Sequence, residues 1–285
     1  MSTKTTLHNA SSRAFAATSS EVNRLEAGFN IDLKLFVIVM DNKGGVGKSK
    51  MAEICYYALA NPAGGTRKVY VGETDNANKT MNMTVGAEFI DLDAVEWQGH
   101  LEDIGHRMAE GEFDHAVLDL GARSEGVVKK FLPEFADLLK PLGVRLVIVR
   151  PITLSTFVQN NASRFCSKTK TDEMGVVMVR NLSQGREEKY FADWMKSDTR
   201  TAMIARGAIE IDMEDAGPRW SDEAIGFRLS FSDIAFSRFD KIKDDELRGL
   251  AIQIFTGPVQ RFLTRWLKRQ AEVFATALFK AAERP

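Results

Sequence analysis

The stretch Asp41-Asn42-Lys43-Gly44-Gly45-Val46-Gly47-Lys48-Ser49 decides the fold of this 285-residue chain. It follows the apolar run 35–40 and precedes a segment, 49–59, with the composition of a helix. Glycines here let backbone amides turn around phosphate oxygens, and the helix directs its positive end at the same charge. In this pattern the lysine reaches the β- and γ-phosphates and the next hydroxyl binds Mg²⁺. We therefore predict a nucleotide site made by Asn42, Lys43, Gly44, Gly45, Val46, Gly47, Lys48 and Ser49, with Ser49 as metal ligand.

Short apolar runs alternate with helical segments along most of the chain. The runs are almost entirely apolar, which is typical of strands covered on both faces. Alternation of this kind predicts an α/β fold: a doubly wound, mostly parallel sheet with helices on both faces, and with the glycine-rich loop at the carboxyl edge. The expected strands are 35–40, 69–72, 116–120, 144–149 and 176–179, and the expected helices are 49–59, 99–110, 124–139, 155–167 and 187–196.

The composition favours one large domain. Residues 1–30 are rich in Ser, Thr and Ala and are interpreted as an extension, and 31–285 as a single domain with a mainly helical part after residue 212. With 44% hydrophobic and 27% charged residues the chain can bury a full core. No apolar run approaches the roughly 20 residues of a membrane span, and no secretory signal is visible, so a cytoplasmic location is expected.

The loop departs from the general phosphate-loop pattern at two positions. Asn42 replaces the first glycine, and an additional lysine, Lys43, follows it, which gives K-G-G-V-G-K-S. In this form the chain resembles the ParA/MinD family of deviant Walker A ATPases, within the SIMIBI class of P-loop NTPases, over about 33–181. The resemblance implies that Lys43 reaches the phosphates of a partner subunit and thereby couples ATP binding to dimerisation.

Two further segments support the resemblance. The segment 71–76 looks like the family's D-x-D motif, with Glu73 in the first position, and implies that Asp75 positions the attacking water or belongs to the outer shell of Mg²⁺. The segment 113–121 is similar to the Walker B strand and implies that Asp119 holds Mg²⁺ through water, although a strand-end Asp also caps turns. The catalytic residues implied are Lys43, Lys48 and Asp75.

A third segment, 176–181, resembles the strand whose end meets the adenine base. It implies that Asn181 or Arg180 contacts the base, although an Asn after a strand is also ordinary turn chemistry. Lys50 stands where the family usually has a second Ser or Thr.

The function implied is an ATP-dependent dimerising switch with a weak ATPase activity, using ATP and Mg²⁺, that partitions or positions a plasmid, chromosome region or large complex. A homodimer and an ATPase-stimulating or cargo adaptor protein are the expected partners. An accessory ATPase of conjugative DNA transfer or plasmid stability remains an alternative, as does a small-molecule kinase or ligase of the dethiobiotin synthetase type. A bridging iron-sulfur cluster is disfavoured because Cys166 stands alone after the Walker B segment.

Two weaker sequence patterns bear on whether such a switch would act on DNA or on a membrane. Basic residues could form a patch for sequence-independent DNA binding, and with it nucleoid association. An apolar stripe in 259–281 suits either a membrane surface or the protein core, and we favour the core, with DNA preferred over membrane. The basic residues are Arg164, Lys168, Lys170, Arg261, Arg265, Lys268 and Arg269.

Overall fold

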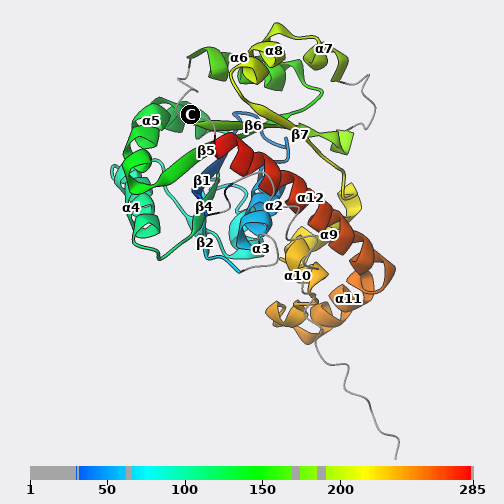
Figure 1. Ribbon diagram of the computed structural model, residues 1–285. Helices are drawn as coiled ribbons and strands as arrows, with labels where there is room; N and C mark the ends of the chain where they lie inside the picture. The colour runs from blue at the N-terminus through cyan, green and yellow to red at the C-terminus, as the bar shows by residue number, and fades with distance from the viewer. Residues whose placement is uncertain (1–29, 31, 62–65, 169–173, 185–190, 284–285) are drawn as a thin grey trace, which may run out of the picture.

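The computed structural model describes residues 30, 32–61, 66–168, 174–184 and 191–283 (Figure 1). Within these residues a seven-stranded sheet runs in the order β3-β2-β4-β1-β5-β6-β7, and every paired neighbour is parallel. This order, with β1 inside the sheet, confirms the doubly wound parallel sheet. The strands are β1 Lys34–Val39, β2 Val69–Glu73, β3 Glu88–Phe89, β4 His115–Asp119, β5 Val144–Ile152, β6 Gly175–Asn181 and β7 Ile209–Met213.

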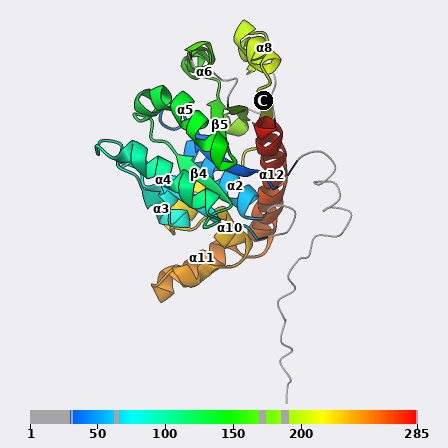
Figure 2. The ribbon, with the colours of Figure 1, turned by 60° about the vertical axis from the view of Figure 1, so that its left-hand side comes forward.

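Helices cover both faces of the sheet, because successive strand side chains point to opposite sides. In β1, Leu35 and Val37 belong to one buried cluster and Phe36 to the other. Figure 2 shows α12 on one side of the strands and α4 and α5 on the other. The first face carries α2 Lys48–Ala60, α3 Thr80–Val85 and α12 Pro258–Ala282, and the second carries α4 Trp97–Ala109, α5 Glu125–Leu139, α6 Thr156–Lys168 and α8 Asp198–Ala205.

The C-terminal part is helical, as the sequence predicts. It contains α9 Pro218–Gly226, α10 Phe231–Ala235, α11 Asp245–Phe255 and the long α12. The apolar stripe of α12 packs against α2, α10 and the sheet, and Trp266, Leu267 and Phe274 are buried there. The interpretation of this stripe as core is therefore confirmed. None of the described helices has the length and apolar character that a bilayer crossing requires.

Some elements differ from the sequence-based prediction. The five expected strands are present, but β3, β7 and α8 were not expected. The helix predicted over 187–196 is represented by the single turn α7, Ala192–Met195, while 187–190 lie outside the described residues. Residues 1–29 of the predicted extension also lie outside them. Three 3₁₀ helices complete the described chain: Lys140–Leu142, Leu182–Gln184 and Phe239–Lys241.

Candidate nucleotide-binding site

The glycine-rich loop lies where the ends of three parallel strands meet. β1 pairs with β4 on one side and β5 on the other, and the loop leaves the carboxyl end of β1. The register places Val39 opposite Asp119, and Asp119 opposite Glu73 on the next strand. Ligands of doubly wound sheets bind at this edge. The loop and the two strand-end acids are therefore brought together by the sheet itself.

The loop conformation requires glycine at two positions. Gly45 and Gly47 have φ of 70° and 91°, in the left-handed region. A Cβ on Gly47 would lie 2.7 Å from the side-chain nitrogen of Asn181, whereas Gly44 and Gly45 have no atom within 4 Å of such a Cβ. α2 begins immediately afterwards, at Lys48, so its unpaired N-terminal amides face this open space. The geometry fits a phosphate group.

The Lys48 side chain lies inside the loop. It is 8% exposed, and its Nζ donates to the carbonyl oxygen of Lys43 at 2.8 Å. Burial lowers the pKa of this amine, and the carboxylates of Asp119 and Asp41 oppose the shift. A bound phosphate would replace the carbonyl oxygen as the acceptor of the Lys48 amine. It would also supply the negative charge that stabilises the protonated, buried amine.

Ser49 and Asp119 form the candidate magnesium position. Asp119 is 2% exposed, and the Ser49 hydroxyl lies near enough to its carboxyl group to favour the charged form. Burial raises the pKa of Asp119 to about 7. Its Oδ1 has no hydrogen-bond partner among the described atoms. An orphaned oxygen beside a hydroxyl at the loop suits a hydrated cation, because Mg²⁺ retains waters and takes few protein ligands. The described residues contain no group of three or more His, Cys, Asp or Glu that could hold a metal.

Glu73 and Asp75 have different surroundings. Glu73 is fully buried, and its carboxylate oxygens accept the backbone N–H groups of Met81 and Asn82 in the first turn of α3. Burial raises its pKa, and these two bonds oppose the shift. Glu73 therefore positions α3. Half-buried Asp75 lies against the loop after β4, since a Cβ on Gly121 would be 3.1 Å from its Cα.

Asn181 contacts the loop, and Arg180 does not. Asn181 Nδ2 donates to the carbonyl oxygen of Val46 at 3.0 Å, which fixes the second half of the loop. Arg180 forms an ion pair with Asp212 of β7, with 2.7 Å between Nε and Oδ1. Contact of either side chain with a base stays a prediction; for Arg180 it would require leaving Asp212.

The first half of the loop is held by α6 and its preceding turn. The exposed Lys43 Nζ lies 3.0 Å from the hydroxyl oxygen of Ser155, and Asn161 donates its side-chain amide to Asn42. These bonds leave the lysine at the surface of its own chain. Residues such as Ser155 and Asn161 carry no sequence signal of their own for this role.

Lys50 points away from the loop toward the C-terminal helices. Its Nζ bonds the Ser221 hydroxyl on α9 and lies 5.0 Å from the centre of the Phe231 ring on α10. Burial lowers its pKa. This lysine therefore joins the helix that starts at the phosphate loop to the C-terminal part of the fold.

Sequence reasoning missed a buried charge cluster behind the loop. Arg150 of β5 is fully buried and bonds Asp41 Oδ2 at 3.0 Å and Glu125 Oε1 at 3.1 Å. The sequence of β5 does not single it out, because the strand also contains the exposed Arg145, and a buried guanidinium that needs carboxylate partners is recognised only once burial is known.

The basic residues considered for DNA binding fall on two sides of the sheet. Arg261, Arg265 and Lys268 are exposed on α12, while Arg164 is exposed on α6, which covers the opposite face. The exposed Arg269 pairs with Glu214 at 2.7 Å. Lys170 lies outside the described residues. Among the candidate residues whose side chains are described, Arg164 is therefore separated from those of α12.

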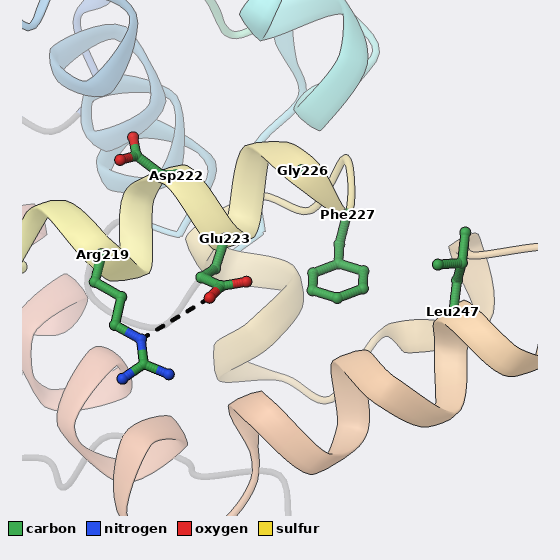
Figure 3. A pocket seen from close by; sticks show the side chains of 6 residues that line it. All are labelled: Arg219, Asp222, Glu223, Gly226, Phe227 and Leu247. Carbon is green, nitrogen blue, oxygen red and sulfur yellow. Dashed lines mark ion pairs between the residues drawn. The ribbon is translucent and has the colours of Figure 1, made fainter.

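A surface groove of about 530 Å³ lies between α9 and α11, away from the phosphate loop (Figure 3). Arg219 and Glu223, 3.9 Å apart, flank it on α9, and Phe227 and Leu247 give it apolar walls. None of its lining residues belongs to the loop, so the groove is separate from the nucleotide site.

The chain has a doubly wound α/β fold in which a glycine-rich loop joins β1 to α2. No family model and no curated protein matches it. Among similar solved structures, the signal recognition particle 54 kDa protein from Aeropyrum pernix K1, in complex with GDP, is 13% identical, with 87% of this chain and 53% of that chain covered and a TM-score of 0.43.

Two further structures are similar over a shorter part. Chloroplast FtsY from Physcomitrella patens is 14% identical, with 57% of each chain covered and a TM-score of 0.36. FtsY from Mycoplasma mycoides is 13% identical, with 56% of this chain and 58% of that chain covered and a TM-score of 0.36. The chain spans about half the length of these solved structures. With sequence identities of 13% and 14% and TM-scores of 0.43 and 0.36, the similarity to these structures says nothing about the function of this chain.

Proposed function

We propose that the protein is an ATP- and Mg²⁺-dependent dimerising switch that hydrolyses ATP slowly. The observation that carries this proposal is the orphaned, buried Oδ1 of Asp119, next to the Ser49 hydroxyl and the open glycine loop. A strand-end acid that only capped a turn would have its oxygens satisfied. Here the carboxylate oxygen without a hydrogen-bond partner lies where a phosphate-bound cation would bind.

Each loop residue has a defined part in binding the nucleotide. The backbone N–H groups of 44–49 donate to the phosphate oxygens, and Lys48 exchanges its carbonyl partner for a phosphate. Ser49 is the direct ligand of Mg²⁺, and Asp119 holds it through water. When bound, Mg²⁺ neutralises charge on the phosphates during phosphoryl transfer. Asp75 orients the attacking water, so the isolated protein has its own, slow, hydrolytic machinery.

Dimerisation is supported by the surface around the loop. Lys43 is exposed, as are Val127 at the start of α5 and Phe157 at the start of α6, with exposed fractions of 47% and 52%. All three belong to segments that begin at the carboxyl edge of the sheet. Exposed apolar side chains and an exposed lysine at the same edge of the sheet suit contact with a second subunit, in which Lys43 meets the partner's phosphates.

The switch would be used to position a cargo through an adaptor protein that stimulates hydrolysis. Nucleoid DNA is the preferred surface, because Arg261, Arg265 and Lys268 form an exposed basic row on α12. Binding through such a row would be independent of DNA sequence and would weaken steeply with salt.

Nucleotide binding tests the first part of this proposal. Isothermal titration of ATP, GTP and ADP with Mg²⁺ is expected to give binding that is tighter for ATP than for GTP and is lost in Lys48→Ala. Lys243→Ala, at an exposed lysine just before α11, is the matched control and should bind like wild type. Equal affinity of wild type and Lys48→Ala would reject the loop as the site. Preference for GTP would retain the site and reject ATP.

A further inference from the structure

Arg150 lies in the middle of the protein, yet it carries a charge. It occupies β5 between apolar neighbours, and its side chain is 0% exposed. Burying an ion costs several kcal/mol unless carboxylates compensate it. The guanidinium also stacks over the Phe165 ring of α6, 4.7 Å from its centre. Because burying this guanidinium costs free energy, its presence calls for an explanation in stability or in function.

The two carboxylates that bind Arg150 come from the two loops of the nucleotide site. Asp41, bound at 3.0 Å, is the residue immediately before the phosphate loop. Glu125, bound at 3.1 Å, opens α5, directly after the loop that follows Asp119. One buried cation therefore bridges the loop that faces the phosphates and the loop that follows the magnesium carboxylate.

On the phosphate-loop side, hydrogen bonds continue to the functional lysine. Asp41 uses Oδ2 for Arg150 and Oδ1 for the backbone N–H of Lys43, at 2.9 Å. The carbonyl of Lys43 in turn accepts Nζ of Lys48 at 2.8 Å. The orientation of the Lys43 peptide thus depends on the carboxylate that Arg150 holds.

On the other side, a second set of bonds reaches the loops after β4 and β2. Ser124, adjacent to Glu125, accepts the Thr74 hydroxyl at 3.1 Å, and Thr74 accepts the backbone N–H of Gly121 at 2.9 Å. Thr74 neighbours Asp75, whose Cα lies against Gly121. The three loops of the site form one hydrogen-bonded unit.

The cluster is poorly designed for stability alone. Glu125 Oε2 and Arg150 Nε are buried without a hydrogen-bond partner among the described atoms. Unsatisfied buried atoms cost stability, and apolar side chains can replace a buried ion pair at little cost. A locally unfavourable arrangement beside a binding loop is typical of functional sites.

We propose that Arg150 is a positioning residue, which acts through Asp41 to hold the Lys43 peptide, and through Glu125 to hold the loop after β4, in the arrangement that receives nucleotide phosphates. This inference rests on the proposed nucleotide binding. Arg150 itself touches neither phosphate nor metal.

Nucleotide affinity in a set of variants tests the proposal. Dissociation constants for ADP and a slowly hydrolysed ATP analogue are measured with Mg²⁺ for Arg150→Met, Arg150→Lys, Asp41→Asn and the double variant Arg150→Met/Asp41→Asn. Circular dichroism first fixes a temperature at which each variant is folded. Arg150→Met and Asp41→Asn should each weaken binding by about 10-fold or more, the scale of a lost charge-assisted bond. The double variant should bind nucleotide no more weakly than the weaker-binding single variant, since both substitutions break the same Arg150–Asp41 ion pair.

A conservative variant and a remote control separate positioning from simple stability. Arg150→Lys keeps the charge but replaces the planar guanidinium, whose two nitrogens reach separate carboxylates, with a single ammonium, so its affinity should lie between those of wild type and Arg150→Met. Arg200→Met breaks an ion pair with Glu210 near β7, 2.9 Å long, and should lower Tm without changing affinity.

The outcomes distinguish this inference from the proposed function. If wild type binds nucleotide while folded Arg150→Lys and Asp41→Asn bind it equally well, the positioning role is wrong and the function stands. Should Arg150→Met fail to fold, these two variants decide the question. Absence of binding in wild type would overturn the proposed function, and this inference with it.

Discussion

The ε-amino group of Lys43 lies 3.0 Å from the hydroxyl oxygen of Ser155 in its own chain. The resemblance to deviant Walker A ATPases implies that this lysine serves a partner subunit. In the described structure it is exposed and held back on the turn before α6. If Lys43 meets a partner's phosphates, as proposed above, dimerisation would break the Lys43–Ser155 bond.

Removing this contact should favour the dimer. Ser155→Ala releases the Lys43 amine from a surface hydrogen bond of about 0.5 to 1 kcal/mol in each subunit, so the dimer formed with an ATP analogue, which breaks two such bonds, should tighten by roughly 5- to 30-fold. Sedimentation velocity over a concentration series measures this constant. Ser155→Thr keeps the hydroxyl and serves as the control. A dimer dissociation constant unchanged by Ser155→Ala would show that the Lys43–Ser155 bond does not affect dimerisation.

The exposed apolar residues beside the loop should be required for assembly only. We expect Val127→Asp and Phe157→Asp to abolish the nucleotide-dependent dimer, since each would bury a charge in the interface, while ATP affinity changes less than about 2-fold. Leu250→Asp, on α11, alters a residue of similar exposure, 46%, and should leave the dimer intact. Full dimerisation of both loop-side variants would move the interface elsewhere.

Gly47→Ala should destroy the phosphate loop. Its φ of 91° costs an L-residue about 1 kcal/mol or more, and the new Cβ would meet the Asn181 amide at 2.7 Å. Because that amide holds the Val46 carbonyl, nucleotide affinity should fall by at least about 10-fold. Gly99→Ala in α4 meets no atom within 4 Å and should bind normally. Calorimetric titration of both variants is the measurement, and tight binding by Gly47→Ala would contradict this loop geometry.

His115 should make the protein sensitive to mild acid. Burial lowers its pKa from 6.5 to about 4, and its Nδ1 accepts the N–H of Leu35 at 3.2 Å. Between these two values the unfolded chain binds the proton and the folded chain does not. Stability present above pH 6.5 is therefore lost as the pH falls toward 4, by about 3 kcal/mol.

Urea unfolding at pH 7 and pH 4.5 measures this loss. His115→Asn retains an acceptor without titrating in this range, so its stability should depend less on pH than that of wild type. The exposed His106 provides the control, because His106→Asn should keep the full dependence. Equal pH dependence of wild type and His115→Asn would refute the assignment.

The sheet and the loop could be predicted because their patterns are local. Strands buried on both faces leave continuous apolar runs, and the glycines, Lys48 and Ser49 stand in one contiguous segment. β7 escaped prediction because it reads Ile-Glu-Ile-Asp-Met, with acids that become satisfied only by tertiary ion pairs. Glu210 binds Arg200 and Asp212 binds Arg180.

The same limit applies to the site. Asp41, Glu125 and Arg150 are separated by 25 to 109 positions and meet only when the parallel strands align. Glu73 matched a motif in sequence, but its oxygens serve the first turn of α3. Such roles depend on long-range geometry, which spacing in one sequence does not contain.

Nucleotide-dependent association decides whether the protein is an ATP-dependent dimerising switch. Light scattering coupled to gel filtration is measured for wild type and Lys43→Ala, each with Mg²⁺ and either ADP or a slowly hydrolysed ATP analogue. We expect wild type to be a dimer with the analogue but not with ADP, and Lys43→Ala to be a monomer with both nucleotides. A wild type that stays monomeric with the analogue, or a Lys43→Ala protein that dimerises equally well, would contradict this expectation.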